Sequence, residues 1–442
     1  MSRLLVAAAA VMMIALGGAR AAHAQIKMSI EGPQSRISPI AVSGLKNLGG
    51  DDSGVLSDQF VKLVRRDLAL SGYFRIIDPK AYIENPQTTG YDIGQFNFAD
   101  WSSINADFVV KGAVSNKDGQ VSLEALLFDV AQQRRMMGKQ FNGGPADESE
   151  MARRFADAVL EAVTGVRGPF DTRIAFVSTD GGRFKEIYTA APDGGDLFRV
   201  TNNQTINLFP TFVHGPSQLL YVSYKSGEPA LYLANPGKGE EVKIESGHGT
   251  PIGGALTPDG NEIVAAVENG GRTNLYLLDS SGGDIRQLTH GGSINVNPAI
   301  STDGQNLAFT SDRSGSPQIY VMPLAGGDAR RVTYQGNYNT SPAFSPKGDW
   351  IAYQSRGGGV FSIYMVPTAG GDAVQLTDEK SSQSPSWSPD GRYIIFSARS
   401  GGRERLYLMQ VNTQQKTGKI ISALMEDDGN DSSPAWSWWM GE

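Results

Sequence analysis

The chain has 442 residues, no cysteine and a formal net charge of −7. This acidic balance makes nucleic acid an unlikely partner, because phosphates attract basic surfaces. The lack of cysteine excludes thiol nucleophiles and thiolate metal sites, while a chain of this length buries enough apolar surface to fold without disulfide bonds.

Residues 1–24 have the features of a secretory signal peptide. Arg3 precedes an apolar run from Leu4 to Leu16, and the small-residue sequence Ala22-His23-Ala24 follows as a cleavage site. The apolar run is too short to span a bilayer. We expect a soluble mature protein that starts near Gln25 and has a net charge of −9, because the removed segment carries two arginines and no acidic residue.

Residues 25–165 lack any repeat and alternate between strand and helix patterns, which predicts a small α/β domain. One helix is expected from Ser53 to Gly72 and a second from Glu148 to Gly165, since apolar residues recur at intervals of three and four in both. Phe108 to Val114 and Val121 to Phe128 flank a hairpin signal, and Met136 to Phe141 predicts a further strand.

The segment that follows the signal peptide has its own pattern. Ile26, Met28 and Ile30 alternate with polar residues, which is typical of an extended strand with one apolar face. Such a segment could add to the edge of a partner's sheet.

Residues 172–442 contain an internal repeat. Six tyrosines stand at successive steps of 44, 44, 44, 44 and 43 residues: Tyr188, Tyr232, Tyr276, Tyr320, Tyr364 and Tyr407. A threonine series runs in the same frame and includes Thr201, Thr289, Thr333 and Thr377. Repeats of this length with several short strands are typical of a β-propeller. We therefore predict an all-β six-bladed β-propeller.

The first repeat lacks its own first strand, and the end of the chain supplies a match. Ser433-Pro434-Ala435-Trp436-Ser437 resembles the first strand of the other repeats, while the propeller starts at Arg173 with a second-strand pattern. We expect the C-terminal strand to pair into blade one and close the ring, which leaves no free edge.

The sequence lacks the common motifs of catalytic sites. The chain has no nucleophile elbow, no His-Glu-x-x-His pair and no Walker loop. His214, His248 and His290 are interpreted as loop residues, and the acidic run 426–428 with Asp431 as a solvated loop, because the alternating ligand spacing of a calcium loop is missing. We expect no catalytic residue, no metal and no cofactor.

The segments just before the first strands all fall at one end of the ring, which we call the mouth. They carry amides, hydroxyls and aromatic residues, which suit a peptide or protein partner. The candidate mouth residues are Asn207, His248, Thr250, Asn295, Asn297, Tyr338, Asn339, Thr340, Gln383 and Asp431.

The order of signal peptide, α/β domain and six repeats, with repeats such as Ser341-Pro342-Ala343-Phe344-Ser345 and the closing strand from Ser433, resembles the TolB family of the Tol-Pal system. The resemblance covers nearly the whole mature chain. It implies a periplasmic, non-enzymatic adaptor that binds the lipoprotein Pal at the mouth and is thereby peripheral to the outer membrane.

The resemblance also implies that Gln25 through Arg36, with Ile26, Met28 and Ile30, binds TolA. Family members support outer-membrane integrity and invagination during cell division, and colicins or phage proteins exploit the pore for import. Two alternatives stay open at the level of sequence: a propeller lyase or hydrolase acting on a saccharide or peptide, and a propeller that scavenges small ligands.

Overall fold

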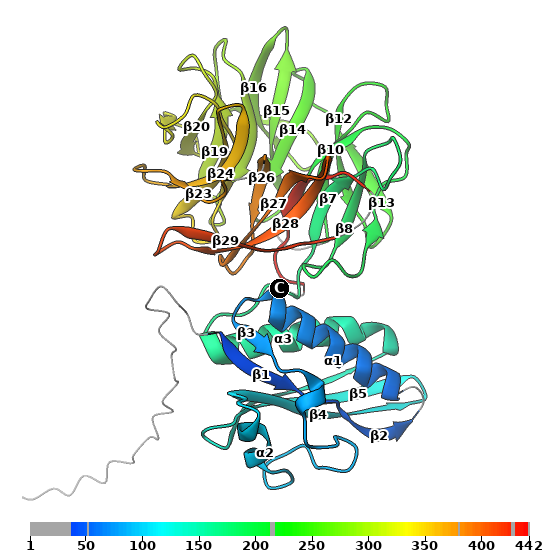
Figure 1. The fold of residues 1–442 in the computed structure, drawn as a ribbon. Coiled ribbons are helices and arrows are strands. Elements are labelled where there is room, and N and C mark those ends of the chain that lie inside the picture. Colours follow the sequence, from blue (N-terminus) through cyan, green and yellow to red (C-terminus); the bar gives the residue numbers. More distant parts are fainter. Residues whose placement is uncertain (1–36, 51–52, 213–216, 379–380, 426–428, 441–442) are drawn as a thin grey trace, which may run out of the picture.

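The computed structural model describes residues 37–50, 53–212, 217–378, 381–425 and 429–440. These residues form an α/β unit and a propeller, stacked one on the other (Figure 1). The predicted signal peptide, Ile26, Met28, Ile30, His214 and the acidic run 426–428 lie outside the described residues, and the predicted domain limits stay predictions.

The α/β unit is built on a mixed sheet in the order β3-β1-β4-β5-β6, with β2 paired to β4. Its strands are β1 (Ser38–Val42), β2 (Lys46–Gly50), β3 (Phe74–Ile76), β4 (Phe108–Lys117), β5 (Gln120–Asp129) and β6 (Arg134–Gly143). The hairpin and the further strand predicted from the sequence are therefore present.

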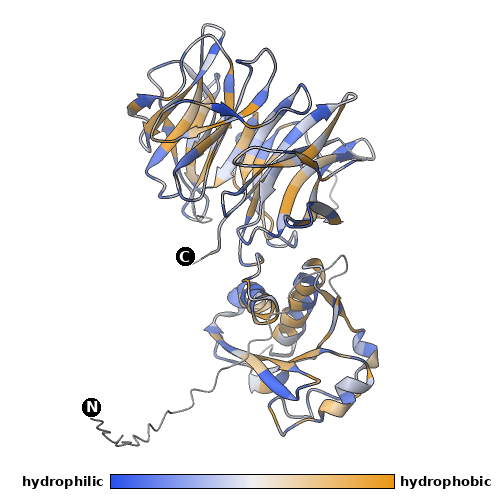
Figure 2. Cartoon of the chain, turned by 90° about the vertical axis from the view of Figure 1, so that its left-hand side faces the viewer, coloured by the Kyte–Doolittle hydropathy of each residue, from blue (hydrophilic) through white to orange (hydrophobic). Residues whose placement is uncertain are grey.

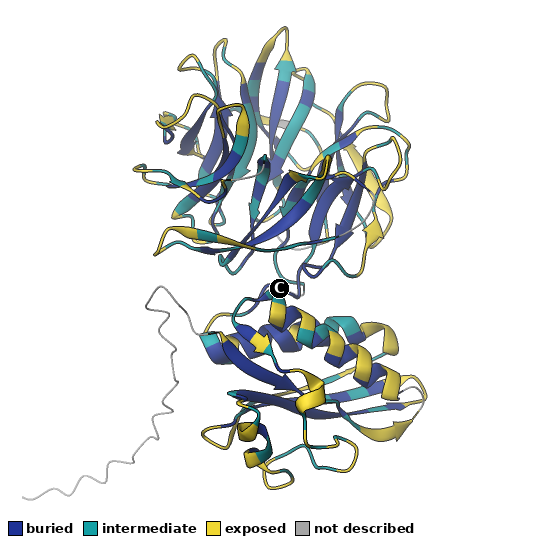
Figure 3. Ribbon diagram, in the orientation of Figure 1, coloured by how far each residue is buried: buried dark blue, intermediate teal, exposed yellow. Residues whose placement is uncertain are grey.

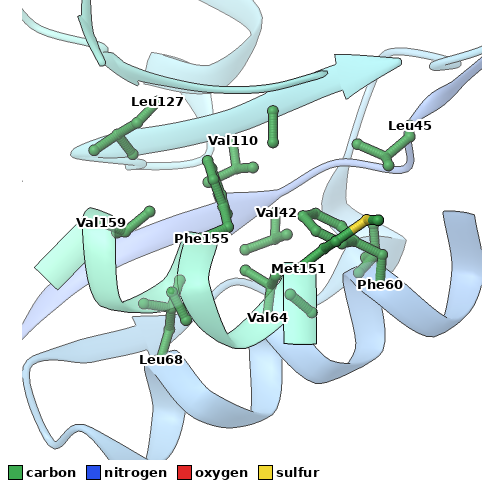
Figure 4. Close-up of a cluster of buried hydrophobic side chains, with 14 of the residues drawn as sticks. Val42, Leu45, Phe60, Val64, Leu68, Val110, Leu127, Met151, Phe155 and Val159 are labelled. Atoms are coloured by element: carbon green, nitrogen blue, oxygen red, sulfur yellow. The ribbon is translucent and has the colours of Figure 1, made fainter. Parts of the chain in front are cut away.

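Two long helices cover one face of this sheet. They are α1 (Ser53–Leu70) and α3 (Glu148–Thr164), and the ring centroids of Phe60 and Phe155 lie 5.8 Å apart between them (Figure 4). α3 ends at Gly165, whose φ of 78° fits a left-handed helix cap. The short helix α2 (Phe98–Ser103) and the 3₁₀ turns η1 (Pro79–Ala81) and η2 (Pro145–Asp147) complete the unit.

The propeller consists of six four-stranded antiparallel sheets. Blade one contains β30 (Asp431–Trp436), β7 (Ile174–Ser178), β8 (Glu186–Ala190) and β9 (Phe198–Arg199). Blade two contains β10 (Asn207–Phe212), β11 (Leu219–Ser223), β12 (Ala230–Asn235) and β13 (Glu240–Ile244). Blade three contains β14 (Thr250–Leu256), β15 (Glu262–Asn269), β16 (Arg272–Asp279) and β17 (Asp284–Gln287).

The remaining blades follow the same order. Blade four contains β18 (Asn295–Ile300), β19 (Asn306–Ser311), β20 (Gln318–Pro323) and β21 (Arg330–Arg331). Blade five contains β22 (Asn339–Phe344), β23 (Trp350–Gly357), β24 (Val360–Pro367) and β25 (Val374–Gln375). Blade six contains β26 (Ser382–Trp387), β27 (Tyr393–Ser400), β28 (Arg403–Asn412) and β29 (Thr417–Ala423).

The C-terminal strand β30 pairs with β7, which is the arrangement predicted from the sequence. Asp431 lies opposite Ser178 and Trp436 opposite Ile174. Because the first and last parts of the propeller share this sheet, the ring is closed by backbone hydrogen bonds.

The tyrosine repeat has a packing explanation. In five blades the tyrosine stacks on an aromatic ring of the neighbouring strand, as Phe309 and Tyr320 do with ring centroids 6.0 Å apart. These pairs belong to the apolar interiors of the blades, where hydrophobic and buried residues concentrate (Figures 2 and 3). In blade three the residue opposite Tyr276 is Ala265, and the ring of His248 stacks on the tyrosine instead.

The α/β unit contacts the end of the propeller where the first strands finish. Arg392, in the turn between β26 and β27, donates hydrogen bonds to Thr164 Oγ1 and to the carbonyl of Arg167, both at 3.0 Å. Tyr393 donates from its hydroxyl to the carbonyl of Ser71 at 2.7 Å. The predicted mouth therefore lies at the opposite, open end of the ring (Figure 1).

Candidate functional site

Several of the predicted mouth residues do not face solvent. The side chains of Asn207, Asn295 and Asn339 are 0% exposed, and Asp431 and Thr340 are also buried. These residues lie at the predicted end of the ring, but their side chains turn inward. In this structure they have no surface to offer a partner, which corrects their assignment as contact residues.

The buried asparagines connect neighbouring blades. Asn339 donates from Nδ2 to Gln318 Oε1 at 2.8 Å, and Thr333 donates from Oγ1 to the same oxygen at 2.8 Å. Thr333 also accepts a bond from the backbone N–H of Ile319 at 2.9 Å. Buried polar groups require such partners, so the network holds the first strand of blade five against blade four.

The same network recurs at two further junctions. Asn207 donates to Glu186 Oε2 at 3.0 Å, next to Thr201, which donates to the same oxygen at 2.5 Å. Asn295 donates to the carbonyl of Thr273 at 3.0 Å. The recurring threonines and asparagines in the sequence are therefore residues that hold neighbouring blades together.

The other predicted mouth residues retain some exposure. His248 and Tyr338 are exposed, while Thr250, Asn297 and Gln383 are half-buried. Asn297 lines the central channel, and Tyr338 packs edge-on against Phe361 with ring centroids 6.0 Å apart. The structure thus brings these five residues to one end of the ring, in sectors from four different blades.

Exposed apolar residues at the same end form a set that we call the mouth rim, of which only Tyr338 was among the predicted mouth residues. Ile206 and Ile294 are 45% and 46% exposed and directly precede buried Asn207 and Asn295. The rim consists of Ile206, Phe209, Ile294 and Tyr338. Strand alternation directs the side chains of Ile206 and Ile294 away from those of Asn207 and Asn295, but alternation alone does not tell which residue of each pair is buried.

The residue before the first-strand proline has a left-handed backbone in five blades. Phe209, Asn297, Ser341, Ser384 and Ser433 have φ between 51° and 55°. Each lies at a break in the pairing register of its strand, as between Gln383 and Ser386. These β-bulges bend the inner strands where the channel opens.

A central cavity of about 510 Å³ runs inside the six first strands. It is lined by prolines, small hydroxyl residues and aromatic residues that include Trp387, Trp436 and Trp438. None of the described lining residues has an ionisable side chain. The acid, base or charged cluster that a propeller lyase would need at this pore is thus missing from the described lining.

One arginine, Arg313, contacts the buried polar network at the mouth. Arg313 donates from Nη2 to Asn295 Oδ1 at 2.9 Å, and its guanidinium carbon lies 4.9 Å from the ring centre of Tyr320. Burial lowers the pKa of Arg313 from its usual value. The arginine therefore braces the buried asparagine through a hydrogen bond and a cation–π contact.

The described residues hold no cluster of metal ligands and no membrane-spanning helix. Among the residues that the structure describes, no three histidine, aspartate or glutamate side chains gather closely enough to hold a metal ion. No described helix is long and apolar enough to cross a membrane.

The fold and the mouth define a propeller-based binding scaffold with an appended α/β unit. A family model described as the TolB beta propeller domain matches residues 160–440, and one described as the TolB amino-terminal domain matches residues 26–136. The chain belongs to the TolB family, as its sequence resemblance indicated.

Curated relatives agree with this assignment. The chain is 37% identical over 198 residues to the Tol-Pal system protein TolB of Desulfosudis oleivorans, which covers 45% of each chain. It is 37% identical over 232 residues to the protein of the same name from Syntrophus aciditrophicus, which covers 51% of each chain. The chain spans about half the length of the curated relatives it matches.

A solved structure extends the similarity to both units. The crystal structure of TolB from Acinetobacter baumannii superposes with a TM-score of 0.77 at 26% sequence identity. The match covers 91% of this chain and 97% of that one.

Proposed function

We propose that this chain is a non-enzymatic periplasmic adaptor of the Tol-Pal system that binds the lipoprotein Pal at the propeller mouth and TolA through its N-terminal segment. In this role it supports outer-membrane integrity and invagination during cell division. The observation that carries the proposal is the match of both units, in order, to the TolB family models.

The mouth rim supports a protein partner at this end. Four exposed aliphatic and aromatic side chains stand beside a channel without ionisable lining among the described residues. Protein interfaces commonly combine an apolar centre with a polar surround, and here His248 and Gln383 supply polar groups near the rim. The opposite end is occupied by the α/β unit, so the mouth is the accessible end of the ring.

The N-terminal segment is proposed as the TolA site on its sequence pattern. Ile26, Met28 and Ile30 alternate along residues 25–36, ahead of β1. A strand with one apolar face can extend a partner's sheet by backbone hydrogen bonds. The same proposal includes colicins or phage proteins as further partners, which would use the pore of the propeller for import.

The first experiment is a calorimetric titration of the mature chain with the soluble domain of Pal from the same organism. We expect saturable one-to-one binding that an excess of chelator leaves unchanged. Lack of heat at high micromolar concentration would reject the assignment of Pal as partner, and a strong chelator effect would reject a metal-free interface.

The TolA assignment is tested separately with a variant that lacks residues 25–31. We expect this variant to lose TolA binding and to keep its affinity for Pal, because the segment precedes β1 in the α/β unit and the mouth lies at the far end of the propeller. Retained TolA binding would contradict the assignment.

A further inference from the structure

The joint between the α/β unit and the propeller contains many buried ionisable groups. Arg153 of α3 is buried, bonds to Asp196 and places its Nη2 atom 3.4 Å from Asp193 Oδ1. Arg66 of α1 places Nη1 3.4 Å from Asp193 Oδ2. Both aspartates belong to the loop between β8 and β9, so two arginines from different helices hold one loop of blade one.

Asp67 of α1 lies beneath these contacts and is unusual in its surroundings. Its side chain is fully buried, and neither carboxyl oxygen has a hydrogen-bond partner. Asp193 faces it from the propeller, Arg153 and Asp157 from α3, and Arg66 from its own helix. Burial, followed by repulsion from Asp193, raises the pKa of Asp67 well above its usual value.

Asp157 of α3 holds the linker that leads into the propeller. Its Oδ1 accepts from the backbone N–H of Phe170 at 2.8 Å, and its Oδ2 accepts from that of Asp171 at 3.0 Å. Arg167 and the Asp171 carboxylate face it from the linker. Burial raises the pKa of Asp157 to about 8, although the two backbone bonds oppose this shift.

The remaining charged groups of the joint have both signs and lie on α3, on the linker and on the propeller. They include Glu148, Glu150 and Arg154 of α3, Asp171 and Arg173 of the linker, Asp196 of blade one, and Asp390 and Arg392 of blade six, which form an ion pair. The hydroxyl of Tyr393 in blade six also faces Asp157. Arg154 and Arg167 both lie within 3.3 Å of Asp171 Oδ2. The arginines are therefore already engaged with other carboxylates, and Asp67 has no hydrogen-bonded cation of its own.

We propose that this joint is a proton-dependent clasp, which stays closed while Asp67 and Asp157 carry protons and loosens when they ionise. A second buried negative charge beside Asp193 would repel the loop of blade one that α1 and α3 hold. Ionised Asp157 would likewise favour exposure of the linker, because a buried charge is costly unless it is paired. The clasp is a property of the joint and does not depend on which partner the mouth binds.

The direction of the effect follows from the shifted pKa values. An exposed aspartate has an ordinary pKa of about 3.9. Asp67 and Asp157 would become exposed in a loosened joint, so they would lose their protons there well below neutral pH. The closed joint retains them up to pH values near 8 for Asp157. The closed joint is thus fully favoured below about pH 4. As the pH rises from there toward the raised pKa values of Asp67 and Asp157, each group lowers the ratio of closed to loosened molecules by up to tenfold per pH unit.

The test measures the distance between the two units as a function of pH. The chain has no cysteine, so Lys117→Cys in the α/β unit and Asp328→Cys in blade four give two specific labels at exposed positions. Distance distributions from pulsed electron spin resonance are recorded on the mature chain from pH 5 to pH 9. We expect one narrow distance at pH 5 and a loosened population that grows at least tenfold between pH 6 and pH 9.

Matched variants identify the groups responsible. Asp67→Asn with Asp157→Asn keeps the side-chain shape without a titrating proton, and we expect its distances to stay narrow at pH 9. Asp58→Asn, at an exposed position of the same helix α1, should behave like the parent chain. The proposal is overturned if the parent distances are the same at pH 5 and pH 9, or if the double variant loosens as the parent does.

Hydrogen exchange gives a second readout that needs no variant. Protection of the backbone from 165 to 172, corrected for the intrinsic pH dependence of exchange, should fall between pH 6 and pH 9. Constant protection over that range would overturn the proposal even if the double variant did not fold.

Discussion

Asn339 donates a hydrogen bond from Nδ2 to Gln318 Oε1 over 2.8 Å and thereby joins blade five to blade four at the mouth. Corresponding bonds join Asn207 to Glu186 and Asn295 to Asn274, the latter at 3.4 Å. The residues that distinguish this face in the sequence are thus largely those that dock one blade on the next. We therefore expect a partner to contact the exposed residues of the mouth rim and not the buried asparagines.

Replacement of Asn339 by alanine should destabilise the propeller. The substitution removes one of the two donors to Gln318 Oε1, the other being Thr333, and removes the donor to the carbonyl of Gln335. The loss of these bonds costs about 1 to 3 kcal/mol in the free energy of unfolding. Urea unfolding followed by tryptophan fluorescence measures the loss. Asn337→Ala, at an exposed position of the same loop, is the matched control and should change stability by less than about 0.5 kcal/mol. Equal effects of the two substitutions would contradict the docking role.

Substitution at the mouth rim should weaken partner binding and leave the stability of the propeller nearly unchanged. Ile294→Ser with Tyr338→Ser removes exposed apolar surface, so we expect about tenfold weaker binding of Pal and little change in the melting temperature. Calorimetric titration and thermal unfolding on the same samples measure both quantities.

The control for the rim is Ile420→Ser. Ile420 is also an exposed aliphatic residue, but it lies on β29, the outer strand of blade six. This variant should bind Pal like the parent chain. Unchanged affinity in the double variant would remove the rim from the interface.

The repeat was enough to predict the fold because each repeat must bury the same faces. The tyrosine period, the proline that recurs within five of the six inner strands and the matching C-terminal strand define six blades and their closure. The direction of an individual side chain at a strand end was not predictable in this way. Asn295 and Ile294 differ by one residue, and only the pairing register decides which one is buried.

The buried charged residues at the joint between the α/β unit and the propeller could not be predicted from the sequence, for a different reason. Asp67, Arg153 and Asp193 come from α1, α3 and blade one, and no local pattern links them. On the sequence each resembles a surface charge of an amphipathic helix or a turn aspartate. Their burial arises only when the two units pack together.

Glu148 at the start of α3 should make stability depend on pH. Burial raises its pKa to about 7, with Arg153 opposing and Asp196 adding to the shift. A raised carboxyl pKa stabilises the fold fully below the unfolded value of about 4.3, and the contribution is lost as the pH rises through about 7. Urea unfolding at pH 5 and pH 8 should show a loss of stability to which Glu148 contributes on the order of 3 kcal/mol. Glu148→Gln should remove that contribution and leave those of Asp67 and Asp157. Glu161→Gln, exposed on the same helix, should leave the pH dependence as it is.

The left-handed residue at each bulge offers a test of how the channel is shaped. Ser384 has a φ of 53° and directly precedes Pro385, and its backbone N–H donates to Gln354 Oε1 at 2.8 Å. Serine already places a Cβ close to the following carbonyl at this φ, and a β-branched valine adds a second group on Cβ that crowds the backbone further. Ser384→Val should therefore cost about 1 to 2 kcal/mol in the free energy of unfolding. Ser384→Gly should be tolerated, because glycine adopts this backbone without strain.

Gln383→Val separates backbone strain from the effect of adding an apolar side chain. Gln383 pairs with Ser397 in regular antiparallel register, where valine is favoured, so this neighbouring substitution should be nearly neutral in urea unfolding. If Ser384→Val and Gln383→Val cost the same, the left-handed backbone at the bulge contributes nothing specific. If only Ser384→Val is costly, the five equivalent bulge residues, none of which is β-branched, are positions where the bend that opens the channel disfavours a β-branched side chain.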